Sequence, residues 1–370
     1  MFPATRFTKL LRVEYPILLA PMAGASTPEL TAVVSNAGGL GAFPAATLSP
    51  EAIHQGVAEV RKRTSKPFSV NLFILGRTQP DAKQVSRALE LLAPIREELG
   101  LPPGQPLEKY APDNEAQFQA VLEEAPAVAS FTFGILTGAQ VDALKSRGIL
   151  VMGTATTVAE AKAWEAVGAD LVCAQGSEAG AHRGTFLGDF EASLVGAMAL
   201  VPQMVDAVRI PVIAAGGIMD GRGIAAALML GASGAQMGTA FLSSPESGIP
   251  AAWHNAILDA KDDSTRVSRI YSGRYARGIV NDFMRKLTPA VEEIPPYPIQ
   301  NALTGPIRQA AGKAGRGEYL SLWAGQAASM SRGLPAAELF AALVEETRSA
   351  LQRANTSEPP SGERSATRGS

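Results

Sequence analysis

The sequence contains a single cysteine, Cys173, among 370 residues. One thiol excludes an internal disulfide and any cysteine-based zinc site. Cys173 lies in an apolar run (170–174), so we expect a buried and unreactive thiol. The sequence also lacks a zinc-type H-E-x-x-H motif, a Walker A motif and a GxSxG elbow. We therefore predict no metal site, and we expect the chemistry to come largely from a cofactor.

Charge is sparse as well. Charged residues make up 18% of the chain and the net charge is −2, which gives no electrostatic case for a nucleic acid or an acidic membrane surface as partner. No run of eighteen apolar residues occurs, and the first 24 residues contain no sustained apolar segment. We expect a cytoplasmic metabolic enzyme, monomeric or homodimeric, that binds a small molecule and neither nucleic acid nor membrane.

Short apolar runs alternate with helical patterns over about 240 residues. The expected strands are 17–20, 39–43, 68–73, 128–133, 150–153, 170–175, 212–215 and 234–237. Amphipathic stretches between them include 50–63, 138–147, 157–167 and 221–230. Strands that are apolar on both faces suit a parallel sheet covered by helices, and this number of strand–helix pairs predicts an α/β fold, a (β/α)₈ TIM-like barrel. A doubly wound open sheet is the alternative, but no GxGxxG turn follows the first strand.

The pattern predicts three parts: a barrel over 1–250, a smaller, mainly helical appendage over 251–352 that borders the substrate pocket, and a disordered polar tail over 353–370. Helices are expected in the appendage at 251–261, 305–314, 319–330 and 336–352. The long connection 75–114 is rich in proline; we expect one helix at 79–99 and a passage over the active-site face.

Two consecutive strands of this pattern end in small residues, the first at Gly216-Gly217 and the second at Gly238-Thr239. In a parallel barrel, the loops after the last two strands and a helix N-terminus surround a phosphate. Asp220 or Gly221 can cap the helix between the strands. The alternative is an ordinary strand–helix–strand unit with tight turns. The predicted phosphate site comprises Ala215, Gly216, Gly217, Gln236, Met237, Gly238 and Thr239.

The segment 175–184, QGSEAGAHRG, follows the sixth expected strand and contains one of only three histidines, His182. At this end of a barrel strand, an imidazole can remove a proton or hold an anionic substrate by hydrogen bonding. His54 and His254 fit surface or structural roles. Glu178 and Arg183 are either solvated loop charges or a brace for the histidine.

A flat ring is expected to lie against the end of the first strand, at Pro21, Met22 and Ala23, although a simple turn after a buried strand is the alternative. Asn71 places an amide within an apolar strand, and Gln175 places one at the end of another. A buried amide without a partner costs about 1–3 kcal/mol, so a ligand or backbone partner is implied. Residues 130–134 form either core or pocket wall. A phosphate cradle, a ring platform, amides and one histidine together describe a flavin mononucleotide (FMN) site.

With these residues gathered, the sequence resembles the nitronate monooxygenase family, formerly called 2-nitropropane dioxygenases. The resemblance runs from about residue 16 to about residue 330. It rests on APMAG, SVNLF, SFTFG, QGSEAGAHRG, PVIAAGGIMDGRGIAAALMLGASGAQMGTAFL, SGRYARGIVNDF, YPIQN and LWAGQ. It implies a TIM-like barrel with noncovalent FMN and a helical part beside the substrate pocket. The implied FMN contacts are Met22, Ala23, Asn71, Gln175, Gly180, Gly217 and the run from Gln236 to Thr239, and the family histidine falls on His182.

The chain departs from the family pattern at two places. The family loop often reads EAGGHRG, whereas this chain has Ala181. Some members carry a tyrosine and a lysine one and two turns beyond the tyrosine that matches Tyr297, where this chain has Asn301 and Gly305. These departures weaken the transfer of a substrate preference but not that of the cofactor.

The sequence therefore predicts an FMN-dependent nitronate monooxygenase that oxidises alkyl nitronates, propionate 3-nitronate included, with O₂ to a carbonyl compound and nitrite. His182 and Tyr297 would surround the nitro group, and His182 would remove the α-proton of a neutral nitroalkane. One alternative is an NAD(P)H-dependent FMN reductase of enoyl thioesters or quinones on the same fold. Another is a flavin-binding accessory protein without turnover.

Overall fold

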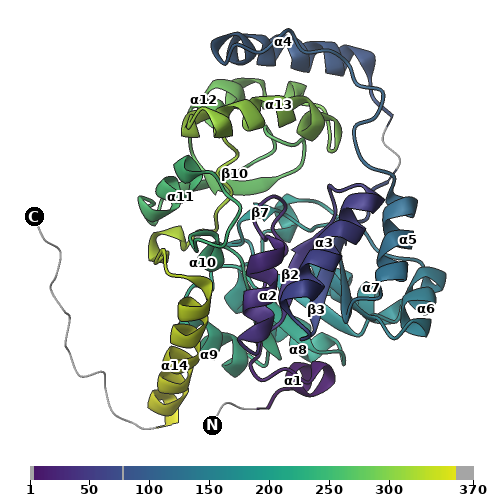
Figure 1. The fold of residues 1–370 in the computed structure, drawn as a ribbon, viewed down its shortest axis with the longest axis vertical. Helices are drawn as coiled ribbons and strands as arrows, with labels where there is room; N and C mark the ends of the chain where they lie inside the picture. The colour runs from purple at the N-terminus through teal and green to yellow at the C-terminus, as the bar shows by residue number, and fades with distance from the viewer. Residues whose placement is uncertain (1–3, 77–78, 356–370) are drawn as a thin grey trace, which may run out of the picture.

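The computed structural model describes residues 4–76 and 79–355 (Figure 1). Its centre is an eight-stranded sheet in the order β1-β9-β8-β6-β5-β4-β3-β2, in which every neighbouring pair is parallel. An isolated parallel bridge between Leu18 and Leu40 joins the two end strands and closes the barrel. The strands are β1 (Ile17–Leu19), β2 (Gly41–Pro44), β3 (Phe68–Phe73), β4 (Val128–Thr132), β5 (Leu150–Ala155), β6 (Leu171–Gln175), β8 (Val212–Ala215) and β9 (Gly234–Met237). The predicted TIM-like barrel is confirmed, and its strands lie within two residues of the expected bounds.

The helices of the barrel part include four that follow the expected amphipathic stretches, at 50–63, 138–146, 158–166 and 221–229. The full set is α1 (Arg6–Leu11), α2 (Pro28–Asn36), α3 (Pro50–Arg63), α5 (Asn114–Glu124), α6 (Gly138–Ser146), α7 (Val158–Ala166), α8 (Ala197–Ala207), α9 (Gly221–Met229) and the buried single-turn α10 (Thr239–Leu242). Local sequence sets the helix starts: Ser49 caps α3 ahead of Pro50, and the Asp220 carboxylate accepts from the N–H groups of Arg222 and Gly223 at the start of α9. Asp220, not Gly221, is therefore the cap.

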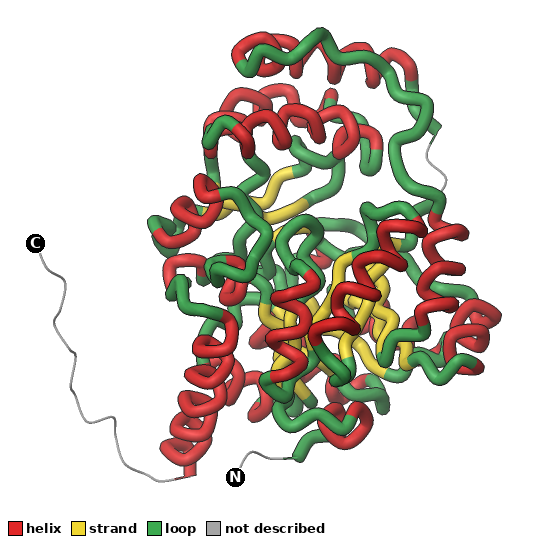
Figure 2. Tube along the Cα trace, viewed as in Figure 1, coloured by secondary structure: helices red, strands yellow, loops and turns green. Residues whose placement is uncertain are grey.

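A second hydrophobic cluster forms the appendage beyond the barrel. Its helices are α4 (Ala82–Glu98), α11 (Ala251–Leu258), α12 (Asp282–Leu287) and α13 (Ile299–Lys313), with 3₁₀ turns at Thr288–Glu293, Gly317–Tyr319 and Ala328–Met330. The appendage also contains a three-stranded antiparallel sheet of β10 (Thr265–Ser268), β11 (Ala276–Ile279) and β7 (Ala181–His182), visible apart from the barrel strands in Figure 2. This sheet joins the histidine loop of the barrel to the appendage, and the sequence did not reveal it.

The helix expected at 319–330 is wrong. Residues 321–325 after the first 3₁₀ turn are not helical; Leu320 and Leu322 are buried in the appendage core, and Trp323 is bridged to Gly278 of β11. Tertiary pairing with β11 therefore overrides the local helical preference. Helix α13 also begins six residues before the expected position, at Ile299.

Two helices pack against a different part of the protein from the one to which the sequence assigned them. Helix α4 contacts α13 and lies over the appendage (Figure 1). It confirms the helix expected at 79–99 to within three residues at each end, and the passage of the proline-rich remainder over the active-site face stays a prediction. Helix α14 (Ala336–Asn355) packs against α9 and α2 and belongs to the outer layer of the barrel. The domain boundaries at 250 and 352 stay a prediction, and the tail beyond residue 355 lies outside the described residues.

No helix in the described parts of the chain has both the length and the apolar composition required to cross a bilayer. Within those same residues, His, Cys, Asp and Glu side chains nowhere gather into a group of three that could hold a metal ion.

Candidate active site

A cavity of about 440 Å³ opens at the carboxyl ends of the barrel strands and is bordered by the appendage. Nearly every residue that the sequence selected lines it. These are Pro21, Met22, Ala23, Asn71, Gln175, Gly180, His182, Ala215, Gly216, Gly217, Gln236, Gly238 and Thr239. Met237 is the exception, because its side chain is buried in the barrel core. Contact of these residues with a cofactor stays a prediction.

One end of the cavity is built from backbone. Gly216 and Gly217 follow β8 with φ of +109° and +71°, in the left-handed region that favours glycine. A Cβ atom at Gly216 would stand 3.1 Å from the backbone nitrogen of Ala179, and one at Gly217 would stand 3.3 Å from Glu178 Cβ. Among the described residues, the N–H groups of Gly216 and Gly217 have no protein acceptor. These glycines therefore fit a bound phosphate.

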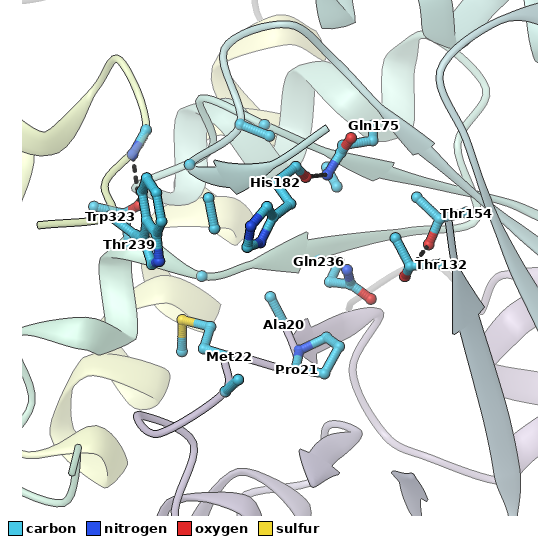
Figure 3. A pocket seen from close by; sticks show the side chains of 18 of the residues that line it. Ala20, Pro21, Met22, Thr132, Thr154, Gln175, His182, Gln236, Thr239 and Trp323 are labelled. Carbon is cyan, nitrogen blue, oxygen red and sulfur yellow. Dashed lines mark hydrogen bonds between the residues drawn. The ribbon is translucent and has the colours of Figure 1, made fainter. Parts of the chain in front are cut away.

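The turn after β1 forms the opposite wall. Ser26 Oγ accepts from the N–H of Met22 at 3.2 Å and donates to the carbonyl of Ala20 at 3.0 Å, which fixes the turn. Figure 3 shows Pro21 and Met22 across the cavity from His182. The turn thus presents small and flexible apolar side chains to the cavity, and the flat ring expected against them stays a prediction.

The two selected amides have partners within the protein. Asn71 Nδ2 donates to the carbonyl and the hydroxyl of Ser130 at 3.1 and 3.0 Å. Gln175 Nε2 donates to the carbonyl of His182 at 3.0 Å, and its Oε1 accepts from the N–H of Gly184 at 2.8 Å. Gln175 therefore fixes the histidine loop as well as lining the cavity, whereas Asn71 Oδ1 has no acceptor bond from any described residue and is free for a ligand.

His182 lies in β7 and is enclosed by aromatic rings. Its ring centroid is 5.5 Å from that of Phe133, 5.7 Å from Tyr297 and 5.4 Å from Trp323. Burial, and then the positive charges of Arg274 and Arg308, lower the pKa of His182 to about 3. The imidazole is therefore neutral at physiological pH.

The remaining selected residues are structural. Arg183 is 1% exposed, and its guanidinium donates to the carbonyls of Gln175, Gly176 and Ser193, so it braces the histidine loop. Glu178 accepts from the N–H of Ala197 at the start of α8.

The other two histidines and the cysteine also match their expected roles. His54 contacts Glu124 on the barrel surface, and His254 contacts the carbonyl of Ser243. Burial raises the pKa of Cys173 to about 12, as expected of an unreactive thiol.

The appendage contributes further lining residues, of which the sequence selected Tyr297 but neither Arg308 nor Trp323. Tyr297, Asn301 and Arg308 line the cavity from α13 and the residue pair before it, and Trp323 lines it from the segment that is bridged to β11. Asn301 and Arg308 are seven residues apart and share one face of the helix, a signal that the sequence contained. Arg308 carries the only formal charge among the described residues that line the cavity, and no carboxylate lines it.

An α/β barrel with a cofactor-sized cavity and a half-buried histidine at the carboxyl ends of its strands has the arrangement of a barrel enzyme. The chain belongs to the nitronate monooxygenase family, whose model matches residues 4–346. A probable nitronate monooxygenase of Staphylococcus saprophyticus is 42% identical over 95% of this chain and 99% of its own length. A second, from Staphylococcus aureus, is 40% identical over the same shares.

Solved structures agree with this assignment. The nitroalkane oxidase from Streptomyces ansochromogenes matches with a TM-score of 0.87 and 40% identity over 94% of this chain and 99% of that one. FabK from Thermotoga maritima matches with a TM-score of 0.76 and 30% identity over 96% and 99%. This is a family of flavin enzymes, so the predicted cofactor is confirmed as a flavin; FMN in particular stays a prediction.

Proposed function

We propose that this protein is an FMN-dependent nitronate monooxygenase that oxidises alkyl nitronates with O₂ to a carbonyl compound and nitrite. The observation that carries the proposal is the charge pattern of the cavity. A neutral His182 and the cation of Arg308 face a space that no carboxylate lines among the described residues. Such a space favours a small anion, and a nitronate is one.

The residues present fit FMN. The backbone of Gly216 and Gly217, with that of Gly238 and Thr239 at the start of the uncapped helix α10, would hold the phosphate. The ring would lie against Met22, with Asn71 and Gln175 at its edge; these and the other predicted cofactor contacts line the cavity, apart from Met237. When bound, FMN supplies the electron transfer and the reaction with O₂.

His182 has two roles that depend on the substrate. A nitronate is already deprotonated, so it needs no base, and the neutral imidazole only forms part of the wall that positions its nitro group. A neutral nitroalkane must first lose its α-proton, for which the unprotonated ring nitrogen of His182 is the base. Tyr297 lies beside the imidazole, and burial raises the pKa of its hydroxyl to about 12, so this hydroxyl stays a hydrogen-bond donor.

Anaerobic mixing of the purified holoprotein with propionate 3-nitronate tests the proposal. The flavin absorbance should change on mixing, and with O₂ present nitrite and a carbonyl compound should accumulate. NADH and NADPH should leave the absorbance unchanged; rapid bleaching by either, with no response to the nitronate, would establish the reductase alternative. A flavin that responds to none of the three would instead identify an accessory protein.

Replacing His182 separates its two roles. The His182→Asn variant should retain FMN and lose activity on neutral nitroalkanes, while activity on preformed nitronates persists at a reduced level. Unchanged turnover of neutral nitroalkanes would remove His182 from the mechanism.

A further inference from the structure

Arg308 is a cation without an anion. Its Nη2 donates to the backbone carbonyl and to Oδ1 of Asn301, at 2.8 and 2.9 Å. Its Nε is buried and has no hydrogen-bond partner. Within the described chain, no aspartate or glutamate forms an ion pair with it. Burial lowers the pKa of the Arg308 guanidinium, although a guanidinium stays charged at neutral pH.

Two other arginines near the site are bound differently. Arg183 donates to three backbone carbonyls, and Arg274 donates to the carbonyls of Arg183 and Thr185 while its guanidinium lies 4.1 Å from the centroid of the Phe133 ring. Neither of the two lines the cavity. Arg308 has a single neutral side chain as partner and faces the cavity. A buried charge is costly unless it is paired, so this arrangement is suited to an anion that arrives with the substrate.

Arg308 lines the same cavity as His182 and Tyr297. Its charge acts to lower the pKa of both residues, against the larger effect of burial in the case of Tyr297, and the rings of His182 and Tyr297 are 5.7 Å apart. The Tyr297 hydroxyl has no partner among the described residues. A small ligand held by His182 at one end therefore has Tyr297 and Arg308 available for a second polar group.

We infer that Arg308, oriented by Asn301 and assisted by the Tyr297 hydroxyl, forms a subsite for a carboxylate carried by the substrate, separate from the nitro group. This inference rests on the proposed function, because it assigns the substrate class of the same cavity. With Nη2 bonded to Asn301 and Nε covered by protein, Nη1 is the guanidinium nitrogen that can donate to a carboxylate, and Asn301 fixes its direction. The subsite makes the enzyme selective for nitronates with a carboxylate a few carbons away over unsubstituted alkyl nitronates.

The kinetic test uses propionate 3-nitronate and propyl 1-nitronate, which differ in having a carboxylate or a methyl group at the far end. The Arg308→Gln variant should raise KM for propionate 3-nitronate by about 10- to 100-fold, the range for loss of a charged hydrogen bond, and change KM for propyl 1-nitronate by less than about 3-fold. Lys313→Gln is the matched control, because Lys313 is an exposed cation on the same helix, away from the cavity. Equal losses with both substrates, or no loss with either, would overturn the subsite.

A binding measurement keeps the inference separate from turnover. Butanoate should raise the melting temperature of the holoprotein and of Lys313→Gln, whereas butanamide should not, and Arg308→Gln should show no shift with either. Butanoate protection that survives in Arg308→Gln would overturn the subsite. A shift that depends on Arg308 in a protein that oxidises neither nitronate would uphold the subsite and refute the proposed function. Arg308→Lys keeps the positive charge but loses the guanidinium group. Its KM for propionate 3-nitronate and its butanoate-induced shift in melting temperature should lie between those of the wild type and Arg308→Gln, and it replaces Arg308→Gln if that variant does not fold.

Discussion

The Nε2 atom of His182 lies 2.8 Å from the hydroxyl oxygen of Ser272. That hydroxyl in turn donates to the backbone carbonyl of Arg274 at 3.1 Å. With its one proton used there, Ser272 accepts from His182, so Nε2 carries the imidazole proton and Nδ1 is the free acceptor. A serine of the appendage thus selects the tautomer of a histidine that the barrel supplies.

Removing this hydroxyl should affect the base more than the binding site. Ser272→Ala should lower kcat/KM for neutral 2-nitropropane by about 3- to 10-fold, the value of one hydrogen bond, because both imidazole tautomers then become populated. The rate with the preformed nitronate should change by less than about 2-fold, since no proton is removed from it. Ser268→Ala, in β10 and away from the cavity, is the control. Equal losses on both substrates would show that Ser272 only supports the local structure.

Acid should destabilise the protein through His182. The pKa of His182 is about 3 in the folded protein and near 6.5 when exposed, so between these values the unfolded chain binds a proton that the native protein excludes. Stability therefore falls as the pH drops through this window, by up to ~1.4 kcal/mol per pH unit. Urea unfolding at pH 7 and pH 5 should show a loss for the wild type that exceeds the loss for His182→Asn by about 1–2 kcal/mol. Parallel losses in the two proteins would contradict the neutral, buried histidine.

The barrel was predictable because its signals are local. Each strand is a short apolar run buried on both faces, and small residues mark the strand ends, so the expected and observed strands agree closely. The same property predicted the glycine turn after β8: only glycine fits φ of +109° and +71° at Gly216 and Gly217 without strain.

The appendage was less predictable because distant contacts decide it. The pairing of β7 with β11 joins residues about ninety positions apart, and neither strand has an alternating pattern of its own. The segment 319–330 was expected to be helical because its apolar residues permit that spacing, yet contacts with β11 keep residues 321–325 out of a helix. Arg308 is one of 33 lysines and arginines, and only the packing of α13 shows that it faces the cavity.

Gly217 should be essential for retention of the cofactor. An alanine there would adopt a left-handed φ at a cost of roughly 1–2 kcal/mol and place a methyl group 3.3 Å from Glu178 Cβ. We expect Gly217→Ala to raise the dissociation constant of FMN by about 10-fold or more through loss of phosphate hydrogen bonds, as measured by flavin fluorescence during dilution. Gly188→Ala is the matched control, because Gly188 has a similar φ of +78° on the surface, and a methyl group there would meet no other atom within 4 Å. Gly188→Ala should lower the free energy of unfolding and leave the dissociation constant of FMN unchanged. Equal dissociation constants in the two variants would show that the glycine turn does not bind the phosphate.

Ala181 is a point of backbone strain beside His182. It has φ of +58° and pairs with Arg277 of β11, so the sheet holds an alanine where glycine would be unstrained. Ala181→Gly relieves roughly 1 kcal/mol of backbone strain in the native state. The greater conformational freedom of glycine stabilises the unfolded chain by a smaller amount. Urea unfolding should therefore show a stability change between zero and a gain of about 1 kcal/mol. Ala341→Gly, on the exposed face of α14, should instead lose about 1 kcal/mol, as glycine does within a helix. Equal destabilisation of the two variants would mean that the backbone at Ala181 carries no strain.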